Sequence, residues 1–174
     1  ISLPSSGGSD KVEMGIEIIK SLNFFEKLVE KHDLLFELQA PMGWDASKNT
    51  LIINPDIFDT KLDKWVSDQS FAINGKPSLQ TAHRDFLRQM SVYVDKKTRF
   101  IYISIEHFSP YVAKKILDLI LIEINEITRD EDIRVAQDSI DFLTKETLNT
   151  QLNEVRSGIN DLIEKQIETI AFAN

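Results

Sequence analysis

The chain has 174 residues with 20 basic and 28 acidic side chains, a formal net charge of -8, and 42% hydrophobic and 28% charged residues. This length suits one domain, alone or with a helical arm, and the composition excludes global disorder. The acidic balance disfavours a broad phosphate-binding surface, so we expect no nucleic-acid partner, and the lack of cysteine excludes disulfides and thiol chemistry.

The N-terminal region predicts a linker followed by two short helices. Residues 1–9 are rich in serine and glycine, which is typical of a flexible linker. Ser9 or Asp10 can cap a first helix and Ser21 a second. The apolar residues of these helices recur at helical spacing: Val12, Ile16 and Ile19 in the first, then Phe24, Leu28 and Val29.

The next stretch is poor in regular patterns. Residues 33–47 read as irregular, with Pro41–Trp44 as the strongest break, and 50–53 as a short strand stopped by a proline. We interpret Trp44 and Trp65 as anchors of the core and not as ligand platforms, because neither lies in a visible constellation of polar partners. Asn74-Gly75 resembles a hairpin turn, but Lys76-Pro77-Ser78 follows in place of a strand. Ser78 can instead cap a helix over 79–90.

A β-hairpin and a long helix come next. Residues 91–95 and 100–105 are β-branched and aromatic, and 95–98 suits a type I turn. The basic residues at this turn fit a solvated loop better than a nucleic-acid footprint: Lys96, Lys97 and Arg99. Ser109 can cap the following helix, and Pro110 fits its first position because proline lacks the N–H that would be unpaired there.

The helix that begins at Pro110 meets no glycine or proline before Gly158. If it continues to Thr147, it is about 55 Å long, so its later part should project from the domain or pack on other chains. Its first part should be buried nearly all round, because apolar residues cover most of its surface: Ala113, Ile116, Leu117, Leu119, Ile120, Leu121, Ile122, Ile124 and Ile127.

Beyond Ile127 the apolar positions thin to a seam. They are Ile133, Ala136, Ile140 and Leu143, spaced by three, four and three residues. This spacing predicts packing against another helix, and we expect an inter-chain seam in which Ile140→Asp weakens assembly more than folding. A solvated helix with one stripe on its own domain fits the periodicity equally well. The spacing then slips and resumes at Leu148, Leu152, Val155, Ile159, Leu162 and Gln166. This change of spacing indicates either a stutter in one helix or a turn between two, and we favour a bend or hairpin near residues 147–150.

These elements predict an α+β fold: a small mixed or antiparallel sheet with flanking helices, then a long protruding helix and a helical hairpin. The expected domains are a linker over 1–9, an α/β base over 10–128 and an extended helical arm over 129–174.

The residues show no catalytic set, so we expect a protein that is not an enzyme and uses no cofactor or metal. His32, His83 and His107 are isolated from one another and match no metal-ligand spacing. No serine lies in a nucleophile elbow. The carboxylates at 130–141 alternate with basic residues, as on a solvated helix face.

Several stretches, taken in order, resemble one family. They are Ser9-Asp10-Lys11, residues 30–35, Gly43-Trp44-Asp45, residues 49–55, Lys76-Pro77-Ser78, residues 95–98, residues 104–110 with Ala113-Lys114, Ile124-Asn125 and residues 139–143. Together they look like the periplasmic part of Wzz-type bacterial polysaccharide chain-length determinants, the polysaccharide co-polymerases. The match covers nearly the whole chain, and its specificity lies in the collinear order of short motifs.

The resemblance implies a bacterial inner-membrane protein, with one transmembrane helix on each side of a periplasmic domain that forms ring-like homo-oligomers. Such proteins set the modal length of O-antigen or similar polysaccharides, which a separate membrane polymerase makes. The expected partners are further copies, that polymerase and the growing polysaccharide. The longest apolar run in the helical region is Leu119–Ile122, so both transmembrane segments are absent from this stretch. A start at Ile1 also suggests a truncated piece.

Two alternatives stay open. The first is the periplasmic sensor of a capsule or exopolysaccharide export system linked to a tyrosine kinase, which a nucleotide-binding domain beyond the second membrane helix would favour. The second is an unrelated coiled-coil adaptor, which a full-length sequence without two flanking apolar spans would favour.

Overall fold

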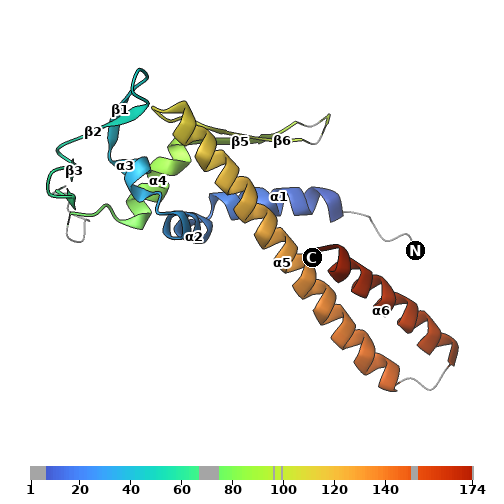
Figure 1. The fold of residues 1–174 in the computed structure, drawn as a ribbon. Helices are drawn as coiled ribbons and strands as arrows, with labels where there is room; N and C mark the ends of the chain where they lie inside the picture. The colour runs from blue at the N-terminus through green and yellow to red at the C-terminus, as the bar shows by residue number, and fades with distance from the viewer. Residues whose placement is uncertain (1–6, 67–74, 96, 99, 150–152, 174) are drawn as a thin grey trace. The chain divides into compact units, whose positions relative to one another are not determined.

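A computed structural model describes residues 7–66, 75–95, 97–98, 100–149 and 153–173, and Figure 1 shows its ribbon. The chain divides into two compact units, Ile1–Glu123 and Ile124–Asn174. The predicted α+β class is confirmed. The boundary between the units lies after Glu123, whereas the sequence places it after residue 128.

Three helices open unit 1: α1 (Gly7–Lys20), α2 (Leu22–His32) and α3 (Leu35–Gln39). Ser21 separates the first two, because its hydroxyl accepts the Phe24 N–H at 3.2 Å as an N-cap and donates to the Ile18 carbonyl at 2.7 Å. The second helix ends at His32 and is followed by the C-cap residue Asp33, which has a left-handed backbone with φ of 49°. The first helix already includes residues 7–9 of the expected linker, since first-turn N–H groups need no helical partner and glycine costs little there. Residues 1–6 lie outside the described residues.

The β structure is divided among three separate two-stranded antiparallel sheets. Strand β1 (Pro41–Asp45) pairs with β2 (Thr50–Ile53), β3 (Phe58–Asp59) with β4 (Lys64–Trp65), and β5 (Met90–Val94) with β6 (Ile101–Ile105). Helix α4 (Leu79–Gln89) lies between the second and third pairs in the chain and is capped by Ser78, whose hydroxyl accepts the Thr81 N–H at 3.2 Å.

Two long helices complete the chain, α5 (Pro110–Asn149) and α6 (Asn153–Ala173). The first has 40 residues and no internal proline or glycine. Helix α5 ends at Asn149 and α6 begins at Asn153, so the slip in spacing falls between two helices and is not a stutter in one continuous helix. Residues 147–149 of the predicted bend are still part of α5, and residues 150–152 lie outside the described residues.

The core of unit 1 is built mainly from α2, α3, α4 and the first part of α5. Its largest fully buried side chains are Phe24, Phe25, Leu28, Leu34, Phe86, Ile116 and Ile120. The rings of Phe25 and Phe86 lie 5.0 Å apart and join α2 to α4. Complete burial of each of these large apolar side chains stabilises the folded state by roughly 1.5–3 kcal/mol.

Three local expectations were wrong. Residues 33–47 contain α3 and β1, because proline is tolerated at the first residue of a strand and pairing with β2 outweighs a glycine inside it. The first part of α5 is not buried all round: Leu121 and Ile122 are 51% and 49% exposed, since the core covers only the side that carries Ile116 and Ile120. Trp44 and Trp65 are half-buried rather than central to the core.

Candidate functional site

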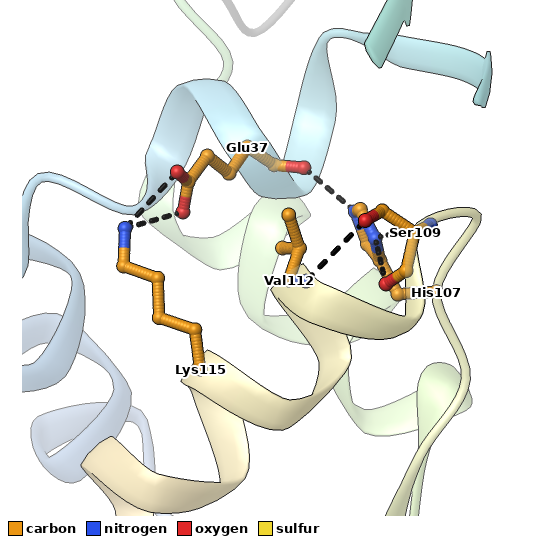
Figure 2. A network of polar contacts seen from close by, with 5 residues as sticks. All are labelled: Glu37, His107, Ser109, Val112 and Lys115. Carbon is orange, nitrogen blue, oxygen red and sulfur yellow. Dashed lines mark hydrogen bonds and ion pairs between the residues drawn. The ribbon is translucent and has the colours of Figure 1, made fainter. Parts of the chain in front are cut away.

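The start of α5 is fixed by a network of polar contacts to α3, shown in Figure 2. The helix begins at Pro110, and the hydroxyl of the buried Ser109 accepts the Val112 N–H at 3.5 Å, which is a long capping bond. The Ser109 carbonyl accepts the Ala113 N–H at 3.0 Å. The two residues expected to start the helix therefore lie at its N-terminus.

His107 holds this corner through both ring nitrogens. Its Nδ1 accepts the Ser109 N–H at 3.1 Å, so the ring carries its proton on Nε2, which donates to the Glu37 carbonyl at 2.9 Å. The Glu37 carboxylate accepts from the Lys115 ammonium at 2.8 and 3.0 Å, one turn further along α5. These contacts, visible in Figure 2, give His107 a positioning role in the fold.

The other two histidines also contact elements far away in the sequence. His83 Nε2 lies 2.9 Å from the Lys20 carbonyl, and its ring lies 5.3 Å from that of Phe25. His32 Nε2 lies 2.8 Å from Oε1 of Glu123. Each histidine thus joins two elements of unit 1, and none lies next to another.

Glu123 is a buried carboxylate that the sequence analysis did not single out. Its side chain is 8% exposed, and its Oε1 accepts from Lys31 Nζ and His32 Nε2, both at 2.8 Å. Burial raises the pKa of Glu123, but the hydrogen bonds and positive charges of Lys31 and His32 outweigh burial and leave the pKa below its usual value. One signal could have revealed it: Glu123 follows Ile116 and Ile120 at i+7 and i+3, on the helix face that is otherwise apolar.

The predicted seam residues lie on one side of α5 within unit 2. Ala136 is 1% exposed, and Ile133, Ile140 and Leu143 are half-buried. In α6 the half-buried positions are Ile159, Ile163, Gln166, Ile170 and Ala173, spaced by four, three, four and three residues. The two helices run antiparallel as a hairpin (Figure 1). Matching three-four spacings on both helices indicate that the seam faces α6 of the same chain.

The hairpin also exposes a second apolar surface that the sequence analysis missed. A groove of about 470 Å³ is lined by Val135, Asp138, Ser139, Phe142, Leu143, Leu162 and Gln166. Within it Phe142 is 61% exposed and Val135 and Leu162 are 47% exposed each. Leu148 is 80% and Val155 45% exposed, so these continuations of the predicted stripe do not face the partner helix, and Leu152 lies outside the described residues.

Charged side chains of unit 2 pair along the helix. Arg134 donates to Glu131 at 2.6 Å and to Asp138 at 2.8 Å. The hydrogen bond from Arg134 holds the pKa of the Glu131 carboxyl below its usual value. This is the solvated pairing that the sequence predicts for the carboxylates of this region. At the hairpin turn of unit 1, Lys97 is exposed, while Lys96 and Arg99 lie outside the described residues.

Two features are absent from the part of the chain that the structure describes. It contains no cluster of three or more histidine, aspartate or glutamate side chains placed to hold a metal ion. None of its helices combines the length and apolar character needed to cross a bilayer.

No protein-family model matches the chain, and no curated protein matches it either.

Proposed function

We propose that this chain is the periplasmic part of a bacterial inner-membrane scaffold that regulates the length of O-antigen or a similar surface polysaccharide. It acts as a homo-oligomer beside a separate membrane polymerase and performs no catalysis itself. The collinear Wzz-type motifs supply the polysaccharide role. The observation that supports homo-oligomer formation is the exposed apolar groove on the hairpin of unit 2.

The groove supports assembly because its exposed apolar side chains lie outside the contact between the two helices of the hairpin. Ala136 is buried, and the half-buried positions of both helices face inward, yet Phe142, Val135 and Leu162 remain about half exposed or more. Clustered exposed apolar side chains rimmed by charge mark interaction surfaces. Burying a phenylalanine side chain at such a surface contributes on the order of 2 kcal/mol.

The test compares the full-length gene with two single substitutions in a strain from which the gene is deleted. Phe142→Asp places a charge in the groove, and Gln137→Asp adds the same charge at an exposed position of the same helix outside the groove. Surface polysaccharide is separated by size on a gel. We expect the deletion to replace a modal cluster of lengths by a smooth decay, wild type and Gln137→Asp to restore it, and Phe142→Asp to fail.

Two results would contradict the proposal. An unchanged length distribution in the deletion strain would remove the polysaccharide role. Loss of total polysaccharide without loss of a modal pattern would favour the kinase-linked export system instead. Sedimentation of wild-type and Phe142→Asp protein tests self-association independently of the polysaccharide phenotype. Equal self-association of the two proteins would show that the groove is not the contact between copies.

A further inference from the structure

Unit 1 contains two adjoining hollows that meet at Trp65. Their volumes are about 590 and 600 Å³, and both are lined by Asp33, Leu35, Trp65 and Lys76. Asp63 lines the first hollow, and Glu30 lines the second. We call these two hollows together the Trp65 cleft. They bring together the end of α2, the β3–β4 pair and the segment that precedes α4.

The indole of Trp65 is held in place but not enclosed. Its ring lies 5.3 Å from Phe58 and 6.5 Å from Phe36, both nearly perpendicular to it. Among the described residues no hydrogen bond involves its N–H, whereas Trp44 donates to the Asn49 side chain at 3.1 Å. The half-buried Trp65 side chain therefore presents an anchored aromatic surface and a donor to the cleft.

The charge of the cleft is unbalanced. Glu37 and Lys115 neutralise each other at 2.8 Å, and His32 contacts Glu123. Within the described part of the chain no hydrogen bond or ion pair involves the carboxylates of Glu30, Asp33 and Asp63, and Lys76 is the opposing charge that remains in the cleft. Three carboxylates against one ammonium favour a cationic ligand and repel phosphate or uronate groups.

We propose that the Trp65 cleft binds an arginine side chain from a basic segment of a partner protein. A guanidinium can stack on the indole while its N–H groups donate to carboxylates, which an ammonium cannot match in plane. A neutral sugar could stack on the ring but would gain little from the negative excess. A second copy of this chain, with a net charge of -8, is a poor electrostatic partner for an acidic cleft. The proposal does not depend on the proposed polysaccharide role.

The test uses the whole chain with Trp44→Phe, which leaves Trp65 as its single tryptophan. Its fluorescence is titrated with blocked glycyl-arginyl-glycine, with the same peptide carrying citrulline, and with maltotriose. We expect a saturable change with the arginine peptide, about tenfold weaker binding of the citrulline peptide, and weaker binding at high salt. Equal responses to the two peptides, or no saturable response to either, would overturn the proposal. Saturation by maltotriose alone would also overturn it and assign the cleft to a neutral sugar.

Substitutions locate the effect. The double variant Asp33→Asn, Asp63→Asn removes two charges, and asparagine tolerates the φ of 49° and 51° at these positions. We expect about tenfold weaker binding of the arginine peptide. Asp56→Asn, an exposed aspartate outside both hollows, is the matched control and should bind as the single-tryptophan parent does.

A gain of affinity provides a second test if the double variant unfolds. Lys76 is exposed and is the one opposing charge, so Lys76→Glu should tighten binding of the arginine peptide severalfold. Unchanged or weaker binding in Lys76→Glu would overturn the proposal.

Discussion

Replacing Glu123 with glutamine should destabilise unit 1 by about 1–2 kcal/mol at neutral pH. Hydrogen bonds to a charged group are worth roughly 1.5–3 kcal/mol, and Glu123 accepts two, from Lys31 and His32 at 2.8 Å each. We expect a loss well below the sum of the two, because glutamine still offers an acceptor oxygen and the Lys31 side chain is 48% exposed and partly screened by water. A loss of this size lowers Tm by roughly 2–8 °C in a chain of this length.

The destabilisation caused by Glu123→Gln should depend on pH. The pKa of Glu123 is lower in the folded than in the unfolded chain, so its ionised form stabilises the fold above the unfolded pKa of about 4.3. That contribution is lost as pH falls through the folded pKa. The Tm difference between wild type and Glu123→Gln should therefore be fully present at pH 7 and shrink as the pH falls below about 4.

Thermal unfolding followed by tryptophan fluorescence measures this difference, because both tryptophans lie in unit 1. Glu146→Gln removes one charge from an exposed position of the same helix and should leave Tm nearly unchanged. Equal Tm of wild type and Glu123→Gln at pH 7, or a difference that grows on acidification, would refute the role assigned to this carboxylate.

Three further substitutions test the helix start, the Trp65 region and the hairpin. Ser109→Ala should cost about 0.5–1 kcal/mol in urea unfolding, at the low end for an N-cap because its bond to the backbone is 3.5 Å long, and a larger loss would show that the hydroxyl does more than cap. Gly75→Ala should cost about 2–3 kcal/mol, since Gly75 has φ of 78° and an added Cβ would lie 2.5 Å from the Trp65 carbonyl oxygen; an unchanged urea midpoint would contradict this. Because Ile140 is half-buried in its own hairpin, Ile140→Asp should reduce both helicity by circular dichroism and self-association by sedimentation, whereas Phe142→Asp should reduce only self-association. Equal helicity loss in both variants would show that the two positions are not distinguished as the structure indicates.

Local signals in the sequence were enough for much of the fold. The β-branched residues around 91–94 and 101–105 and the serine caps before α2 and α4 act over a few residues, so the β5–β6 hairpin and the helix starts could be predicted. Strands β3 and β4 could not, because two residues carry no period and their pairing depends on tertiary contacts such as Phe58 with Trp65.

The candidate surfaces were predicted less well, for a similar reason. A three-four spacing shows that Ile133–Leu143 packs on a helix but does not say whose helix, and in the structure α6 of the same chain fills that role. The exposed groove depends on which face α6 leaves uncovered, and the Trp65 cleft combines segments that lie up to 86 positions apart, from Val29 to Lys115. Neither arrangement leaves a pattern within one segment.

The pairing of β5 with β6 should be visible in circular dichroism, because it stacks two tyrosine rings. Tyr93 and Tyr102 lie opposite each other, with ring centroids 4.8 Å apart and planes 8° from parallel. A slip of one residue in either strand would send one ring to the opposite face of the sheet and break the stack. Coupled phenol transitions in so close a pair should give a near-ultraviolet circular dichroism band that vanishes in Tyr93→Leu or Tyr102→Leu. The alignment of these two strands can thus be followed in solution without any label.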